Sequence, residues 1–498
     1  MIKYISTRII TLILIISVTS IVYEKYFFES DVLKHSDAIH LIRNLDPNTE
    51  VLYIGESSNS TAHATDFDKR KISEMTADFY PKLVFDDITK PASHAGIYKT
   101  LINKIPKKNQ IKTLIVTLNL RSFGWDWVES KLETALNKKM VLLESDFALY
   151  NRFRLGFKAY NQKSEQERRQ AVLKKWDAKL KIDKPYNSVN KWDKHIYKTG
   201  VLDDFGNRDD QKTALTAHFI KNYAFHIDTN NHPRIKDFDE IVEIAKKRNW
   251  NVVFNLLAEN TERANELVGS DLVNMMVENS NLLKEYYTKK GVLVSDHLNL
   301  VADSLYTDRN WPTEHYKEKG RQIIGSHLAT SLRQIYPEAY KHHTYLSYDE
   351  MIAKTNVYEN NLETVKGWTN ETRTNEQAFS GQYATKVNAS HPYGPTLEIP
   401  FYKLNVSLKK SVSYSFKALL TDQNKTSEIV VELHQKDKSV VRKVKKLSEF
   451  NLNNHWQEVS HTFEIEEQFY NSEHFKIYLY NPVESAVYID DLVIEFGK

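Results

Sequence analysis

The chain of 498 residues contains no cysteine. This absence excludes disulfide bonds, thiol catalysis and zinc sites built from thiolates. Glycine and proline are scarce, with 14 and 12 residues, so no Gly/Pro-rich or collagen-like segment is present. The formal net charge is only +3 and no long basic block occurs, so we expect no nucleic-acid partner.

The remaining composition is that of a globular protein. Hydrophobic residues make up 41% of the chain and charged residues 27%, which suits ordinary cores. The length indicates about two to four domains. Aromatic residues reach 12%, with 28 Tyr and 8 Trp, a share that suits contact with carbohydrate and equally suits β-rich cores.

The N-terminus carries a membrane-targeting pattern. Lys3 and Arg8 precede an apolar run over residues 9–23, and extension of the run back to Tyr4 gives about 20 residues, enough to cross a bilayer. No small-residue cleavage site follows. The pattern predicts an uncleaved signal-anchor over residues 1–29, with the N-terminus in the cytoplasm and the bulk in the cell envelope. Secretion after cleavage of a signal peptide is the alternative.

Residues 30–340 alternate between strand-like and helical patterns. We expect a helical stalk over 24–49, strands at 51–54, 82–85, 111–120 and 251–257, a further strand from 291, and a last helix over about 316–335. This alternation predicts an α/β domain with a doubly wound, mostly parallel sheet. Residues 130–235 interrupt it as a helical insertion, which forms either a cleft wall or a solvated elaboration.

A change of pattern divides the chain after residue 340. Residues 341–361 are predicted to be a linker rich in Tyr, His and Asn. Short alternating runs with turn residues between them fill 362–498, so we expect an all-β antiparallel sandwich there.

A serine follows the first predicted strand. Gly55 and Glu56 are followed by Ser57 and Ser58, at the carboxyl end of a strand, where open α/β sheets bind their ligands. Ser57 is the favoured nucleophile, with Ser58 as the alternative. The same residues also suit a simple helix cap.

A serine nucleophile needs a base, an acid and oxyanion donors. His315, in a polar loop that opens the last helix, is the predicted base, and Asp308 the predicted acid. Glu314, Asp303 or a Ser–His dyad without an acid are the alternatives. Gly96 and Asn119, after the second and third strands, are the predicted oxyanion donors. The residues that follow Asn119 are expected either to line a sugar cleft or to pack in the core and at its rim: Arg121, Trp125 and Trp127.

These blocks, in this order, resemble the SGNH/GDSL hydrolase superfamily, and more closely its membrane-anchored branch. That branch includes the D-alanine transfer protein of teichoic-acid biosynthesis and the alginate O-acetylation proteins. The resemblance implies a flavodoxin-like fold over about residues 50–335, with Ser57 as nucleophile, His315 as base and Gly96 and Asn119 at the oxyanion. It departs from the family at Glu56, where Asp is usual, and at Pro312, where the acid usually stands.

The resemblance implies a serine esterase or O-acyltransferase, with acetyl as the expected group, acting on envelope or extracellular polysaccharide. Its implied partners are a glycan, the membrane and proteins of polysaccharide assembly. Hydrolase and transferase both remain open. The departures at residues 56 and 312 favour the alternative of a non-catalytic polysaccharide-binding or assembly protein with the same fold.

Residues 362–498 resemble a carbohydrate-binding jelly roll of the galactose-binding-like type. Trp368, Tyr393, Phe401 and Tyr402 are candidates for stacking on sugars or for core packing. Glu363 and Asp490 loosely match positions that hold a structural calcium ion in that family. No cofactor is expected for catalysis itself.

Overall fold

The computed structural model describes residues 2–36, 38–144, 147–161, 163–345, 355–363, 368, 372–421, 426–436, 438–450, 452 and 454–497. Within these residues the chain forms two compact units, one of Met1–His63 and Lys71–His343, the other of Ala64–Arg70 and Thr344–Lys498. The predicted linker at 341–361 lies partly outside the described residues.

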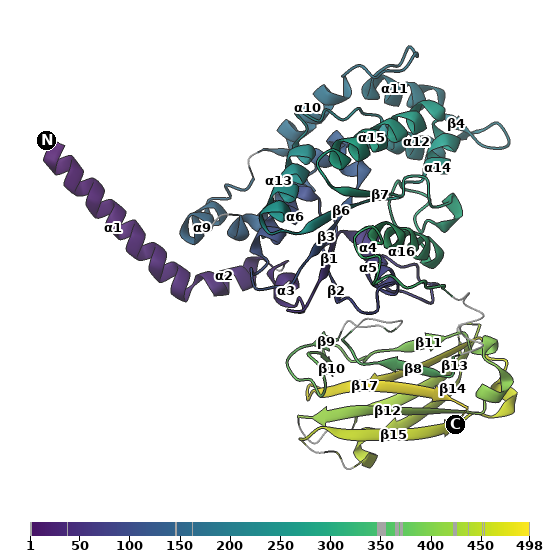
Figure 1. Ribbon diagram of the computed structural model, residues 1–498. Helices are drawn as coiled ribbons and strands as arrows, with labels where there is room; N and C mark the ends of the chain where they lie inside the picture. The colour runs from purple at the N-terminus through teal and green to yellow at the C-terminus, as the bar shows by residue number, and fades with distance from the viewer. Residues whose placement is uncertain are drawn as a thin grey trace. The chain divides into compact units, whose positions relative to one another are not determined.

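The first unit is built on a parallel sheet of five strands in the order β2-β1-β3-β6-β7 (Figure 1). The strands are β1 (Val51–Gly55), β2 (Phe85–Thr89), β3 (Thr113–Leu118), β6 (Asn251–Leu256) and β7 (Leu293–Asp296). All neighbouring pairs in it are parallel. In chain order this is the flavodoxin-like 2-1-3-4-5 arrangement, so the predicted doubly wound α/β fold is confirmed.

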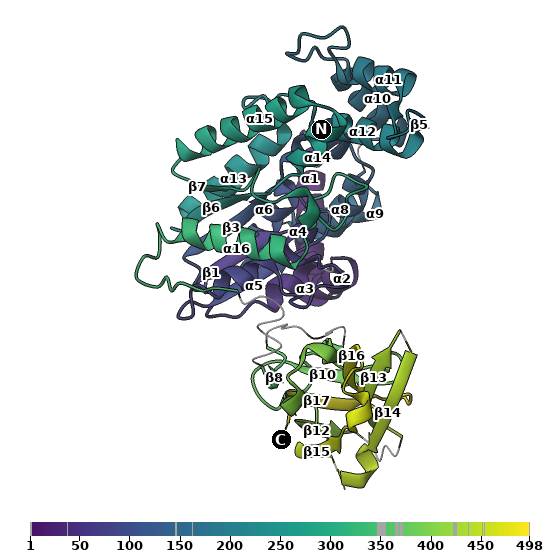
Figure 2. The ribbon, with the colours of Figure 1, turned by 90° about the vertical axis from the view of Figure 1, so that its right-hand side faces the viewer.

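Helices cover both faces of this sheet (Figures 1 and 2). On one face α6 (Ala95–Lys104), α13 (Pro233–Lys247) and α15 (Ser270–Thr288) pack on alternate strand residues such as Leu52, Val116 and Phe254. On the other face α5 (Ile72–Ala77) packs with α16 (Glu318–Leu332). The inner strands β1, β3 and β6 are therefore buried on both sides, which explains their apolar runs.

The second strand lies later in the chain than its sequence predicts. The expected strand at 82–85 ends where β2 begins, and β2 reads Phe85-Asp-Asp-Ile-Thr89. β2 is an edge strand, so four of its five residues stay partly exposed and polar side chains are tolerated. Asp86 accepts the Asp46 N–H, and Asp87 binds Lys71, which satisfies both carboxylates.

Helices dominate the predicted insertion. Two short helices, η1 (Leu120–Phe123) and α7 (Trp125–Val128), lead into it. Its own helices are α8 (Leu132–Met140), η2 (Val141–Leu143), α9 (Ala148–Gly156), α10 (Glu165–Trp176), α11 (Val189–Thr199) and α12 (Asp210–Tyr223), with a two-stranded hairpin of β4 (Val201–Leu202) and β5 (Arg208–Asp209). Capping side chains from Ser164, Ser188 and Asp209 begin α10, α11 and α12. The sequence pattern of a helical elaboration is thus matched.

The N-terminal helix α1 (Ile2–Tyr26) leads into α2 (Phe28–His35) and α3 (Ala38–Arg43), which lie within the predicted helical stalk at 24–49. Residues Arg8–Tyr26 are long and apolar enough to cross a membrane, and that segment is almost entirely unburied. A signal sequence would satisfy the same criteria.

The second unit is an antiparallel β-sandwich. One sheet contains β8 (Val357–Asn360), β9 (Arg373–Thr374), β10 (Ala384–Val387), β12 (Ser411–Leu420), β15 (Gln457–Glu464) and β17 (Val487–Phe496). The other contains β11 (Leu397–Ile399), β13 (Glu428–Gln435), β14 (Lys438–Lys446) and β16 (His474–Tyr480). Alternating inward residues of both sheets form its core, as the alternating pattern predicts.

Candidate active site

Ser57, His315 and Asp308 lie in one hydrogen-bonded row. The Ser57 Oγ is 3.0 Å from His315 Nε2, and His315 Nδ1 is 2.7 Å from Asp308 Oδ2. These distances are those of a nucleophile, a base and an orienting acid. The structure therefore brings together the three residues predicted to be catalytic.

The end of β1 places the serine. Ser57 begins the short helix α4 (Ser57–Ser60) directly after Gly55 and Glu56. A Cβ atom at residue 55 would lie 2.7 Å from both Thr117 Oγ1 and the Tyr53 ring, so only glycine fits where β1 and β3 meet. The first N–H groups of a helix have no acceptor within it. The N–H of Ser57, the first residue of α4, therefore has no acceptor within this helix.

Two backbone contacts explain how Asp308, seven residues before His315 in the sequence, comes close enough to bind its ring. Tyr306 and Tyr316 form an antiparallel bridge, and the Thr307 N–H donates to the His315 carbonyl oxygen at 2.9 Å. Asp308 therefore lies opposite His315 across a narrow loop. The predicted start of the last helix at 316 is slightly early, since α16 begins at Glu318.

The residues on either side of His315 are buried and fixed. Glu314 receives two hydrogen bonds from the Arg121 guanidinium, at 2.7 and 2.6 Å. The Tyr316 hydroxyl donates to the Ala258 carbonyl oxygen at 2.7 Å. Because the side chains on both sides of it are fixed, the backbone of His315 is held in one conformation. The His315 ring is thereby positioned toward Ser57.

Three of the alternative or accessory predictions are corrected by these contacts. Arg121 is not part of a sugar cleft, because its charge is buried against Glu314. Glu314 is not the acid partner of His315, for the same reason. Asp303 is also engaged elsewhere, by Arg309 and the Asn260 amide.

Glu56 contacts the nucleophile directly. The Ser57 hydroxyl donates to Glu56 Oε2 at 2.9 Å, while Glu56 Oε1 is buried without a hydrogen-bond partner among the described residues. Burial, together with the nearby charge of Glu314, raises the pKa of Glu56. Ser57 has a single hydroxyl proton, so it can donate either to Glu56 Oε2 or to His315 Nε2, but not to both at once.

A second buried acid, Glu259, escaped the sequence analysis. It follows β6 at the same edge of the sheet and accepts a 2.6 Å hydrogen bond from the Tyr223 hydroxyl. Burial and the charge of Glu314 raise its pKa well above the usual range. One signal was available in the sequence: a carboxylate directly after an apolar strand of the sheet.

The predicted oxyanion donors differ in their surroundings. Asn119 ends β3 beside the end of β1, and its Oδ1 accepts the Ser122 N–H at 3.2 Å. Its Nδ2 group makes no hydrogen bond within the described part of the chain and is available to a ligand. The Gly96 N–H donates to Nδ1 of His94, the N-cap residue of α6, at 3.1 Å. This contact disagrees with the predicted role of Gly96 as an oxyanion donor.

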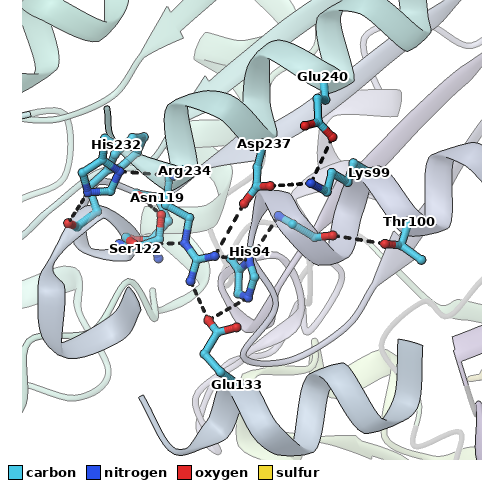
Figure 3. Close-up of polar contacts among 12 residues, drawn as sticks. His94, Lys99, Thr100, Asn119, Ser122, Glu133, His232, Arg234, Asp237 and Glu240 are labelled. Atoms are coloured by element: carbon cyan, nitrogen blue, oxygen red, sulfur yellow. Dashed lines mark hydrogen bonds and ion pairs between the residues drawn. The ribbon is translucent and has the colours of Figure 1, made fainter. Parts of the chain in front are cut away.

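His94 belongs to a buried charge network (Figure 3). Arg234 lies 2.7 Å from His94 Nδ1 and donates to Glu133 at 2.6 Å, and Glu133 also lies 2.9 Å from His94 Nε2. Burial and the positive charge of Arg234 lower the pKa of His94, which keeps the ring neutral. Because Glu133 lies on α8 and Arg234 on α13, the network fastens the insertion to the α/β core.

The two tryptophans after β3 contact cations. The Arg121 guanidinium lies 4.8 Å from the centroid of the Trp127 ring, and Lys175 Nζ lies 4.2 Å from that of Trp125. Trp125 also lines a cavity of about 250 Å³ together with Trp176 and His232. Trp127 therefore supports the buried ion pair, while Trp125 faces a cavity within the insertion.

Glu363 and Asp490, the predicted calcium ligands, accept hydrogen bonds from a loop of the protein. Glu363 Oε1 accepts the N–H groups of Gln382 and Tyr383, and Asp490 Oδ2 accepts those of Phe379 and Ser380. Both carboxylates thus hold the loop at residues 379–383, and a calcium ion at Glu363 and Asp490 stays a prediction. Across the described residues, no group of three or more His, Cys, Asp or Glu side chains has the geometry to bind a metal ion.

Among known proteins, the chain is similar only to solved structures, and at low sequence identity. No protein-family model and no curated protein matches the chain. A two-domain esterase active on acetylated mannans, co-crystallized with mannopentaose, is 7% identical, with 95% of each chain covered and a TM-score of 0.24. The CBM22-1 xylan-binding domain from Paenibacillus barcinonensis Xyn10C is 17% identical over 28% of this chain and 94% of its own, with a TM-score of 0.22. With TM-scores this low, neither carries an argument about function.

Replacement of Arg121 by Met tests the ion pair behind His315. The variant leaves Glu314 as an uncompensated buried charge, so we expect a loss of about 3–5 kcal/mol in the free energy of unfolding. Urea unfolding of the full chain measures it. Arg309→Met, which removes the exposed partner of Asp303, is the control and costs about 1 kcal/mol or less. Equal losses in both variants would contradict a stabilising role of the buried Arg121–Glu314 pair.

The raised pKa of Glu259 predicts a pH-dependent stability. The contribution of Glu259 to the free energy of unfolding is fully present below the pKa of an unfolded Glu. It is lost as the pH rises through the raised pKa of Glu259 in the folded state. Each unit between the two pKa values corresponds to about 1.4 kcal/mol. The urea midpoint of Glu259→Gln should therefore fall less between about pH 5 and pH 8 than that of the wild type. Exposed Glu243→Gln is the control, and parallel curves for Glu259→Gln and the wild type would refute the assignment.

Proposed function

We propose that the chain is an exported, membrane-tethered serine esterase or O-acyltransferase of the SGNH type, which removes or transfers an acetyl group on an envelope or extracellular polysaccharide. The row of Ser57, His315 and Asp308, with contacts of 3.0 and 2.7 Å, carries this proposal. The position of Ser57 at the carboxyl end of β1 supports it, as does the unburied apolar helix α1.

In the first half of the reaction, Ser57 Oγ attacks the ester carbonyl carbon while His315 Nε2 takes its proton. Asp308 accepts the Nδ1–H of the resulting imidazolium and stabilises its charge. The negative oxygen is held by the Asn119 amide and the Ser57 N–H. His315 then returns the proton to the sugar oxygen, the C–O bond of the ester breaks, and the acetyl group remains on Ser57.

In the second half, an acceptor hydroxyl takes the place of the leaving sugar. His315 removes the proton of the acceptor hydroxyl while the acceptor oxygen attacks the acetyl carbonyl carbon. The proton then passes from His315 to Ser57 Oγ as the ester bond to the serine breaks. Water as acceptor gives hydrolysis and free acetate. A second sugar hydroxyl gives transfer, and the same residues serve both reactions.

Hydrolysis of an aryl acetate by the purified full chain tests the row. We expect Ser57→Ala and His315→Ala to lower kcat by about 10³-fold or more, and Asp308→Asn by about 10²- to 10⁴-fold. Ser58→Ala is the matched control and retains activity, with circular dichroism as a check of folding. Unchanged activity in the Ser57 and His315 variants would favour the non-catalytic, glycan-binding alternative.

We further propose that the sandwich binds the polysaccharide through the outer face of its four-stranded sheet. The exposed Tyr393 ring lies 5.7 Å from that of Tyr478 and 5.3 Å from that of Tyr480, both on β16. Arg442 on β14 adds a donor beside Glu432. Aromatic faces with polar neighbours suit sugar rings. Trp368 and Phe401, by contrast, are buried in the core and are unsuited to stacking on a ligand.

Affinity electrophoresis in gels that contain acetylated mannan or xylan tests this surface. In the full chain, Tyr393→Ala should reduce the retardation several-fold, because one stacking ring contributes on the order of 1 kcal/mol. Tyr402→Ala removes an equally exposed tyrosine that has no ring neighbour among the described residues, and it should bind normally. Retardation that is unchanged in both variants would reject the tyrosine cluster as the binding surface.

A further inference from the structure

Helix α9 exposes an aromatic stripe. Three aromatic side chains point away from the core, two on the helix and one directly after it. They are Tyr150, Phe153 and Phe157, which are 59%, 53% and 79% exposed. Their spacing of three and four residues places them on one side of the helix. Ala148 and Leu155 are buried on the opposite side. A helix on the surface of a globular protein normally turns polar residues outward, so this stripe requires an explanation.

The stripe lies at the end of the apolar segment of α1. Helix α9 packs beside α1, as Figure 1 also shows. Arg152 on α9 binds Asp31 at 2.8 Å, and Asp31 accepts a hydrogen bond from the Tyr23 hydroxyl, also at 2.8 Å. These contacts fix α9 at the level where the chain leaves the candidate membrane span.

The chemistry at this level is that of a membrane interface. Tyr26 and Phe27, at the end of α1, are 65% and 57% exposed. Cations accompany the rings: Lys25 Nζ lies 5.4 Å from the centroid of the Tyr26 ring, and the Arg154 guanidinium 5.9 Å from that of Tyr150. Aromatic rings and basic side chains concentrate where lipid headgroups meet water.

We propose that α9 is an interfacial helix, whose stripe of Tyr150, Phe153 and Phe157 inserts into the headgroup boundary of the bilayer that α1 crosses. This inference rests on the membrane-tethered part of the proposed function. With a second contact beside the anchor, the α/β unit cannot swing freely about the end of α1. The membrane thereby becomes part of what orients the active site.

Because the chain has no cysteine, single cysteines can be labelled without background. Phe153→Cys and Phe157→Cys, each carrying a bimane fluorophore, are reconstituted as the full chain into vesicles of phosphatidylcholine and phosphatidylglycerol. Brominated lipids then quench a fluorophore that lies in the bilayer. Phe205→Cys replaces a phenylalanine that is 90% exposed, in the β4–β5 hairpin, and serves as the matched control. Ile13→Cys reports on α1 itself.

We expect quenching at positions 13, 153 and 157, and none at 205. Quenching at 13 without quenching at 153 and 157 would overturn the interfacial role of α9 and leave the anchor intact. Loss of quenching at 13 as well would reject the anchor on which the inference rests. Labels at 153 and 157 that are shielded from aqueous iodide but not quenched by lipid would also overturn it, in favour of a protein partner.

Discussion

The buried ion pair of Arg121 and Glu314 joins two parts of the site that are far apart in the sequence. Arg121 follows β3, while Glu314 immediately precedes His315. A charge pair in this position is stable only because both guanidinium hydrogen bonds are made and the ring of Trp127 covers the cation. The Ser–His contact thus depends on a pair that takes no part in proton transfer.

The same pair sets the electrostatics of the site. Glu56, Glu259 and Glu314 gather around one arginine, and a single cation cannot balance three carboxylates in a dry interior. Burial and the charge of Glu314 raise the pKa values of two of them, Glu56 and Glu259. Such an accumulation of acids costs stability, and it is characteristic of sites that perform chemistry.

The sequence predicted the features that rest on local pattern. Strands β1, β3 and β6 are continuous apolar runs, and the polar residues at their ends lead directly to Ser57 and Asn119. It misplaced β2, because an edge strand with two aspartates has no apolar signal. The ion pair of Arg121 was invisible, since the partner lies almost two hundred residues away. The contact of Asp308 depends on the bridge between Tyr306 and Tyr316, which no spacing rule reveals.

Asp308 is about half exposed, so the acid end of the row stands in water. In the proposed reaction, the acetyl-serine intermediate would lie beside a histidine that is partly exposed to solvent. Hydrolysis by water would then limit the lifetime of this intermediate. Transfer would therefore require the acceptor glycan itself to cover the loop at residues 306–316 and dry the site. In the proposed reaction, the fit of the bound acceptor over this loop would then decide between hydrolysis and transfer.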